Sequence, residues 1–195
     1  MKHILLLLIL IPFWSCKAQT PILSLYNDYP GGVMGAYYKD LDNDLDRFVG
    51  TWKYTNGTTS LTITLQKKVM QPLNDENMHY YEDIVIGEYK YIVNGVEKIN
   101  TLSQLLTTKD PYEYNIVGNI LIGQTNRKLR TSFSEPMREI QGMTQAMIFQ
   151  RADSGSVQKL QLKFMATDGA YTVDGVPLPY TSYSVPFGDY LLVKQ

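Results

Sequence analysis

Apolar and polar residues alternate with a period of two along much of the chain after residue 50. Segments 61–66 and 160–164 show the pattern: leucine, isoleucine or phenylalanine takes every second position, and threonine, glutamine or lysine takes the others. Alternate side chains of a β-strand lie on the same face, so this pattern predicts strands with one buried face. Further apolar runs that we assign to strands are 80–86, 129–133, 143–151 and 190–194.

Turn-forming dipeptides separate several of these segments. An Asn-Gly pair readily adopts the two positive φ angles of a type I′ turn and is the strongest short-range signal for a β-hairpin. Pairs of this kind occur at Asn56-Gly57, Asn94-Gly95, Gly118-Asn119 and Asp168-Gly169. With the apolar runs they predict roughly nine or ten strands, mostly joined by tight turns.

Three short segments have helical signals, and one is rich in proline. Residues 41–48 carry apolar side chains at helical spacing, residues 101–110 begin with a Thr-x-x-Gln capping box, and residues 134–142 run from a serine cap to a glycine stop. Prolines in 174–190 exclude a central strand, so we expect an edge or a loop that covers the core.

Many antiparallel strands of this length bury one face by closing into a barrel or by stacking as a sandwich. We predict an all-β protein: an antiparallel β-barrel or barrel-like meander of roughly nine or ten strands, with one or two short helices.

The amino terminus has the features of a secretion signal. Residues 4–11 are an unbroken apolar run, shorter than the about 20 residues that a membrane span needs. Cys16 is the only cysteine in the chain and directly follows a small residue, Ser15. This arrangement resembles the bacterial lipobox, which implies cleavage before Cys16 and acylation of its thiol. Ordinary secretion with cleavage near Ala18 is the alternative.

We therefore expect a signal peptide at 1–15, a tether at 16–39 and a single β domain at 40–195. An acylated Cys16 holds the protein on a membrane and leaves no cysteine for a disulfide or a thiolate nucleophile. Lys17, in place of aspartate, implies sorting to the outer membrane. No acidic run follows, so we expect the periplasmic face. A secreted or soluble periplasmic protein is the alternative.

Composition narrows the set of partners. The formal net charge is −1, which gives no indication of the concentrated basic face that a nucleic-acid-binding protein needs. Fifteen tyrosines suit half-buried strands and also surfaces that contact glycans or peptides. We expect a monomer whose partners are the membrane and either a small apolar ligand or an envelope protein or glycan.

The usual catalytic and metal-binding patterns are absent from the sequence. The aspartates of DLDNDLD, residues 40–46, fit no register of an EF-hand loop and are interpreted as a solvated helix face. His79, the only histidine after the leader, is expected to be exposed, and Glu82 and Asp83 lie on opposite faces of a strand. No nucleophile elbow or phosphate loop occurs. We predict no catalytic residue, metal or cofactor.

Gly50 and Trp52 stand at the start of the first predicted barrel strand, after the short helical segment. This Gly-x-Trp resembles the signature of the calycins: lipocalins, fatty-acid-binding proteins and avidins. The resemblance implies that the tryptophan plugs one end of the barrel, with a basic residue from a late strand over its ring. Lys194 or Arg151 takes that role here.

Three functions remain open from the sequence. The first is a non-catalytic binding or interaction module with a solid core and a tyrosine-rich exterior. The second is a calycin-like carrier with a cavity lined by Leu61, Ile63, Tyr89 and Phe164. The third is an envelope hydrolase that uses Asp, Glu or Tyr side chains. We favour a non-enzymatic module.

Nearly the whole chain resembles one further family. The SCKAQ leader end, the block YYKDLDNDLDRFVGTWKYTNGTTSLTI and the length are similar to those of Bacteroidota lipoproteins that share a domain of unknown function. The resemblance implies an envelope location but no activity, ligand or site residue.

Overall fold

A computed structural model of the chain describes residues 20–26, 32–75, 78–169 and 178–195. Eight antiparallel strands form a closed β-barrel, which confirms the predicted fold class. The barrel strands are β3 (Gly50–Asn56), β4 (Thr59–Asp75), β5 (Met78–Val93), β7 (Ile116–Ile122), β8 (Lys128–Phe133), β9 (Gln145–Arg151), β10 (Lys159–Ala166) and β11 (Gly188–Lys194).

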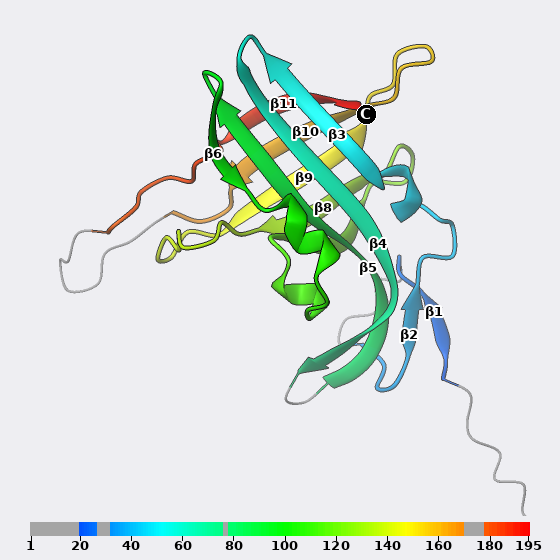
Figure 1. The fold of residues 1–195 in the computed structure, drawn as a ribbon. Coiled ribbons are helices and arrows are strands. Elements are labelled where there is room, and N and C mark those ends of the chain that lie inside the picture. The colour runs from blue at the N-terminus through cyan, green and yellow to red at the C-terminus, as the bar shows by residue number, and fades with distance from the viewer. Residues whose placement is uncertain (1–19, 27–31, 76–77, 170–177) are drawn as a thin grey trace, which may run out of the picture.

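The barrel closes as an up-and-down meander (Figure 1). Each strand pairs antiparallel with the next barrel strand along the chain, β5 pairing directly with β7. The last strand, β11, then pairs with the first, β3, where Lys194 lies opposite Trp52. Closure removes the exposed sheet edges on which other chains could pair.

The interior of the barrel is the main hydrophobic core. Every second residue of the strands points inward, as the period of two predicts. Leu61, Ile63 and Leu65 of β4 are fully buried, as are Leu160 and Leu162 of β10. The same cluster includes aromatic side chains from six barrel strands: Trp52, Tyr89, Tyr91, Phe133, Phe149, Phe164 and Tyr190.

The hairpin predictions succeed at some positions and fail at others. Asn94 and Gly95 form a tight turn with φ of 50° and 77°. At the first hairpin Asn56 pairs with Thr59, so the two turn residues are 57–58, one position later than predicted. The Asp168-Gly169 pair is followed by a long connection, since β11 begins only at residue 188.

The turn predicted at Gly118-Asn119 is wrong. Both residues lie inside the continuous strand β7, where the register with β8 shifts between Val117 and Ile120. A Cβ on Gly118 would lie 2.8 Å from the Cα of Thr131, so glycine allows the two backbones to approach closely. The pair therefore marks a β-bulge in place of a reversal.

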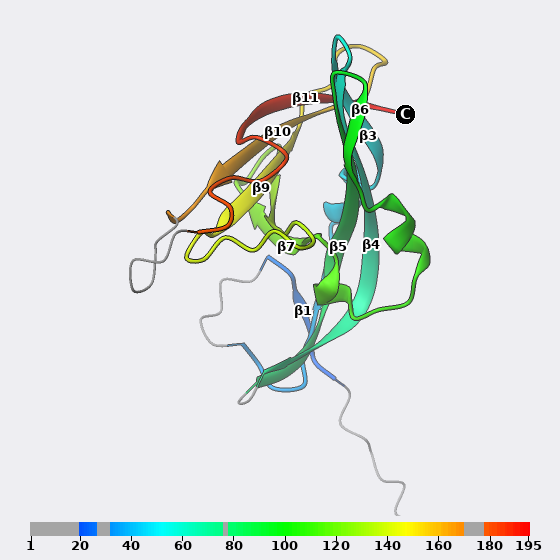
Figure 2. The ribbon, with the colours of Figure 1, turned by 60° about the vertical axis from the view of Figure 1, so that its left-hand side comes forward.

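Three more strands extend the sheet beyond the barrel. β1 (Ile22–Ser24) pairs in parallel with β2 (Tyr37–Lys39), which pairs in parallel with the first part of β5. Figure 2 shows β1 beside the extended part of the β4–β5 hairpin. Parts of the predicted tether thus belong to the folded domain. β6 (Val96–Asn100) pairs with the far end of β5.

The described helices are short 3-10 turns: η2 (Leu45–Arg47), η3 (Leu102–Leu106) and η4 (Pro111–Glu113). At η3 the Thr101 hydroxyl accepts no capping hydrogen bond and instead exchanges hydrogen bonds with the backbone of Tyr89. The helix predicted over 134–142 is wrong, because this segment consists of turns. None of the helices in the described ranges is long and apolar enough to cross a membrane.

The η3–η4 segment covers the outer face of β5. Tyr114 packs against Ile84 and Ile86 in a small second core. Beside it Glu88, fully buried, accepts hydrogen bonds from the Asn115 amide at 2.5 Å and from Lys109 Nζ at 3.3 Å. A buried carboxylate needs such donors, so the contacts fix this segment on the barrel.

Candidate functional site

One end of the barrel is sealed by Trp52. Its side chain is fully buried, and its Nε1–H donates a hydrogen bond of 2.7 Å to the carbonyl of Phe48. Phe48 directly follows η2 and is itself fully buried. The short helical segment predicted over 41–48 therefore lies across this end, and the indole nitrogen fixes it there.

Both basic residues predicted for the plug lie near the indole. Lys194 Nζ is 5.3 Å and Arg151 Cζ is 5.5 Å from the centroid of the Trp52 ring. Arg151 also donates to the carbonyl of Arg47 at 2.9 Å. A cation over an aromatic face stabilises the folded protein by about 0.5–2 kcal/mol, depending on the exposure of the pair to water.

Gly50 provides the space for this arrangement. Its φ of +128° is unfavourable for residues with a Cβ, and a Cβ here would lie 3.0 Å from Lys194 Cε. Glycine at this position therefore allows the lysine stem to reach Trp52. The spacing Gly-x-Trp thus has a direct physical reason in this barrel.

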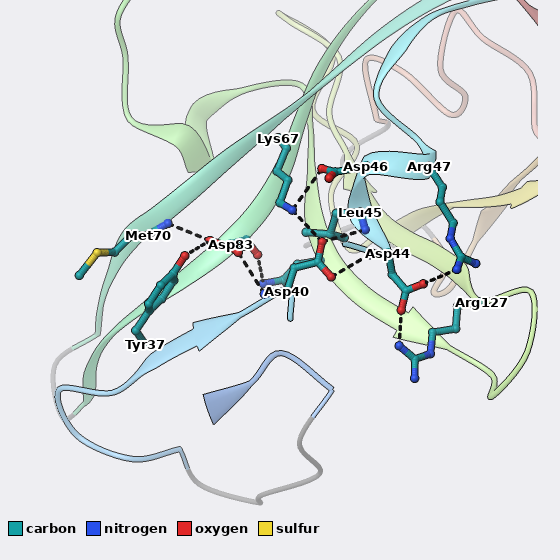
Figure 3. Close-up of polar contacts among 11 residues, drawn as sticks. Tyr37, Asp40, Asp44, Leu45, Asp46, Arg47, Lys67, Met70, Asp83 and Arg127 are labelled. Atoms are coloured by element: carbon teal, nitrogen blue, oxygen red, sulfur yellow. Dashed lines mark hydrogen bonds and ion pairs between the residues drawn. The ribbon is translucent and has the colours of Figure 1, made fainter. Parts of the chain in front are cut away.

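A polar cluster lies beside the sealed end, where the β1–β2 strands join β5 (Figure 3). Asp83, 1% exposed, accepts hydrogen bonds from the Tyr37 hydroxyl at 2.6 Å and from the backbone N–H groups of Asp40 and Met70, both at 3.0 Å. Burial and then the Asp83 carboxylate raise the pKa of Tyr37, so this phenol remains a donor. Asp83 therefore joins β2, β4 and β5.

The aspartates at 40–46 were interpreted as one solvated face, and this is wrong for two of them. Asp40 is buried and accepts from the N–H groups of Asp44 and Leu45 and from Lys67 Nζ at 2.8 Å. Asp44 is buried as well and pairs with Arg127. These carboxylates fix η2 on the barrel, whereas Asp42 and Asp46 are exposed.

The four residues predicted to line an internal cavity are all in the core. Leu61, Ile63 and Tyr89 are fully buried and Phe164 is 1% exposed, packed in the same cluster as Trp52. None of them lines either of the two pockets described below. Their side chains fill the barrel interior.

A pocket of about 990 Å³, here called the mouth pocket, lies at the opposite end of the barrel. The connection between β8 and β9 forms one wall and residues 179–183 form the other, and both figures show these segments side by side. The lining residues are Ser134, Glu135, Met137, Arg138, Glu139, Ile140, Gln141, Gly142, Met143, Thr144, Gln145, Pro179, Tyr180 and Tyr183.

Glu135 fastens the two walls together. Its carboxylate accepts hydrogen bonds from the Ser184 hydroxyl at 2.6 Å and the Ser184 N–H at 2.7 Å. Arg138 pairs with the same carboxylate at 2.9 Å, and its guanidinium lies 4.3 Å from the centroid of the Tyr180 ring. The proline-rich segment 174–190 was expected to cover the core. Its described residues before β11 are thus held over this end of the barrel.

Aromatic rings connect the mouth pocket with the core. Tyr183, in the pocket wall, lies edge-on to Phe133 at 5.4 Å between centroids. Phe133 in turn contacts Phe164 at 4.8 Å and Tyr89 at 5.0 Å. Tyr183 therefore belongs both to the pocket wall and to the aromatic cluster of the core.

A second, smaller pocket of about 350 Å³ lies between β5, η4 and the β7–β8 pair. Tyr112 donates from its hydroxyl to Glu82 at 2.8 Å, and burial, then this carboxylate, raise its pKa. Arg130 also lines the pocket and has no carboxylate within 4.0 Å among the described residues. The pocket combines charged side chains with an apolar lining, and none of the residues of the main core lines it.

Side chains that could bind a metal do not cluster in the described part of the chain. It contains no group of three or more His, Cys, Asp or Glu side chains that could hold a metal ion. His79 is exposed on β5, as predicted. Cys16, the predicted acylation site, lies outside the described residues.

The fold and these features define the protein as an eight-stranded up-and-down β-barrel, plugged by a tryptophan at one end and with a pocket between two loops at the other. Over residues 1–195 the chain matches, and belongs to, the family described as Family of unknown function (DUF6705). No curated protein and no solved structure matches it significantly.

Proposed function

We propose that the protein is a non-catalytic binding module that holds a small, mainly apolar ligand in the mouth pocket. The observation that carries this proposal is the asymmetry of the barrel: Trp52 seals one end, and at the other end lies a pocket whose wall residue Tyr183 contacts Phe133 of the core. Its volume of about 990 Å³ suits a small molecule, because ligand pockets commonly enclose about 300–1,000 Å³.

Binding is favoured over catalysis because the buried acidic group of the pocket wall is already engaged. A general acid or base needs a carboxyl group free to exchange a proton with a substrate. Glu135 accepts hydrogen bonds from Ser184 and forms an ion pair with Arg138. These contacts give its carboxylate a structural role. A hydrolase acting through Asp, Glu or Tyr is therefore the weaker proposal.

The calycin resemblance supports a carrier of this type. Gly50, Trp52 and the two cations stand together at one end of an up-and-down meander, as the resemblance implies. The proposed ligand site differs from the one expected from the sequence, because Leu61 and Ile63 pack in the core. The ligand would lie at the mouth, in contact with Met137, Ile140 and Tyr183.

The first test is native mass spectrometry of the protein recovered from its own cells. We expect an additional mass of a few hundred daltons that is lost on denaturation. Met137, 96% exposed, lines the pocket, so Met137→Asp should reduce ligand retention about tenfold by placing a charge beside an apolar ligand. Leu106→Asp is the matched control, since Leu106 is 89% exposed and outside the pocket.

Equal ligand retention by the two variants would place the ligand elsewhere and contradict the proposal. A protein that carries no additional mass, and that binds no apolar probe in titration, would favour instead a partner protein or glycan on the tyrosine-rich exterior.

We further propose that the module is a lipoprotein on the periplasmic face of the outer membrane. The lone Cys16 after an apolar leader supports acylation, and β1 begins only six residues later at Ile22. A chain of six residues spans at most about 20 Å, so the β1–β2 end of the domain would lie close to the membrane.

Metabolic labelling tests the location. Radiolabelled palmitate should enter the wild-type protein and be absent from Cys16→Ser, which should also leave the membrane fraction. Lys17→Ala serves as the matched control and should still be labelled. Label in the Cys16→Ser protein, or a soluble wild-type protein without label, would contradict acylation and favour ordinary secretion.

A further inference from the structure

The Tyr89 hydroxyl is a buried polar group without a partner. Tyr89 is fully buried in the core, and its Oη has no hydrogen-bond partner among the described residues. Leaving a buried hydroxyl unpaired is unfavourable, so nearly all such groups in folded proteins have a partner. Phenylalanine would fill almost the same volume without this penalty. The hydroxyl therefore requires an explanation.

The surroundings of this hydroxyl point to the mouth pocket. The Tyr89 ring contacts Phe133, the last residue of β8, and Glu135 in the pocket wall follows two residues later. The charged groups that act on the hydroxyl include Glu135 and Arg138, both in the pocket wall. Tyr89 thus lies behind the wall of the pocket, and the Phe133 and Tyr183 rings stand between them.

We infer that the Tyr89 hydroxyl donates a hydrogen bond to a neutral oxygen acceptor, such as a ketone, ester or amide carbonyl, on a ring-containing ligand of the mouth pocket. This inference rests on the proposed function and names its ligand class. The aromatic rings of Phe133 and Phe164 contact the apolar body, and Tyr89 selects the polar group.

The chemistry of the phenol supports a donor role toward a neutral group. Burial, followed by the Glu135 and Glu88 carboxylates, raises the pKa of Tyr89, so the hydroxyl keeps its proton at physiological pH. The same carboxylates would repel an anionic ligand. A neutral carbonyl oxygen accepts the bond without bringing a charge into the core.

Entry requires a local movement of Tyr183. This side chain is 8% exposed and stands between the pocket and Phe133. It lies in the irregular segment before β11, where turning the side chain about χ1 breaks no strand pairing. A ligand ring then takes its place against Phe133.

The experiment uses two probes of nearly equal shape, 2-acetylnaphthalene and 2-ethylnaphthalene, which differ by the carbonyl group. Titration gives the affinity of each probe for the wild-type protein, Tyr89→Phe and Tyr91→Phe. The matched control, Tyr91, is a buried tyrosine on the same strand. Infrared spectra of the ¹³C-labelled ketone report hydrogen bonding to its carbonyl.

We expect the ketone carbonyl band to shift to lower frequency on binding to the wild-type protein and Tyr91→Phe, and not to Tyr89→Phe. The Tyr89→Phe protein should bind the ketone about fivefold more weakly, the equivalent of one ordinary hydrogen bond, and the hydrocarbon unchanged. Without ligand, its melting temperature should rise by about 2–4 °C, because the unpaired hydroxyl is gone.

Other outcomes separate the two proposals. Equal carbonyl bands in the wild-type protein and Tyr89→Phe would overturn the inference, while loss of both probes in Met137→Asp would still support the mouth pocket. A lower melting temperature of unliganded Tyr89→Phe would reveal a partner in the resting protein and also overturn it. If the wild-type protein binds neither probe, both proposals fail for this ligand class.

Discussion

Replacing Trp52 with alanine should lower the free energy of unfolding by about 3–5 kcal/mol, the usual range for deleting a buried aromatic side chain. Trp52 is fully buried, and its loss also removes the hydrogen bond to Phe48 and the aromatic face below Lys194 and Arg151. Urea unfolding followed by far-ultraviolet circular dichroism measures the change, because the substitution removes a fluorophore.

Trp52→Phe separates packing from the polar contacts. Phenylalanine keeps a ring for the two cations but lacks the N–H that holds Phe48, so we expect a smaller loss of about 1–2 kcal/mol. The carbonyl of Phe48 would then lack this donor, and hydrogen exchange should accelerate in η2. A loss below about 1 kcal/mol for Trp52→Ala would mean that Trp52 does not seal the barrel.

The barrel and its sealed end were the most predictable parts of the molecule. The period of two is a local property of a strand, so segments such as 160–164 reveal their buried face without tertiary information. The Gly50-x-Trp52 pattern is also local, and through the resemblance it led to both Lys194 and Arg151. The structure brings all four residues together.

The mouth pocket could not be predicted, because neither wall has a regular period. Its two sides come from turns after β8 and from an irregular segment before β11, joined between Glu135 and Ser184 across 49 positions of sequence. The residues 134–142 have helix-like caps, but Glu135 and Arg138 bond to each other and to the opposite wall. Long-range pairing overrides the local signal here.

The aspartates near η2 illustrate the same limit for charged residues. Four aspartates in alternate positions look equivalent in sequence. Asp40 can be buried because Lys67, 27 positions away in the sequence, donates to its carboxylate. Asp44 can be buried because Arg127, 83 positions away, does the same. A carboxylate is buried only where the fold supplies hydrogen-bond donors. Donors that lie far away in the sequence cannot be recognised before the fold is known.

Asp83→Ala should lower the free energy of unfolding by about 3–5 kcal/mol, because it leaves several buried donors without an acceptor. The Tyr37 hydroxyl and the N–H groups of Asp40 and Met70 all donate to this carboxylate. Asp46→Ala is the matched control: Asp46 also carries a carboxylate, but its side chain is 56% exposed, so a change within about 0.5 kcal/mol is expected.

The position of Asp83 predicts where the structure should loosen. Its contacts join β2 and the bulged part of β4 to β5, outside the closed part of the barrel. Hydrogen exchange in Asp83→Ala should therefore accelerate first at residues 37–40, while the β9–β10 pair keeps its protection. Uniform acceleration across both regions would instead show that the β1–β2 strands and the barrel unfold as one cooperative unit.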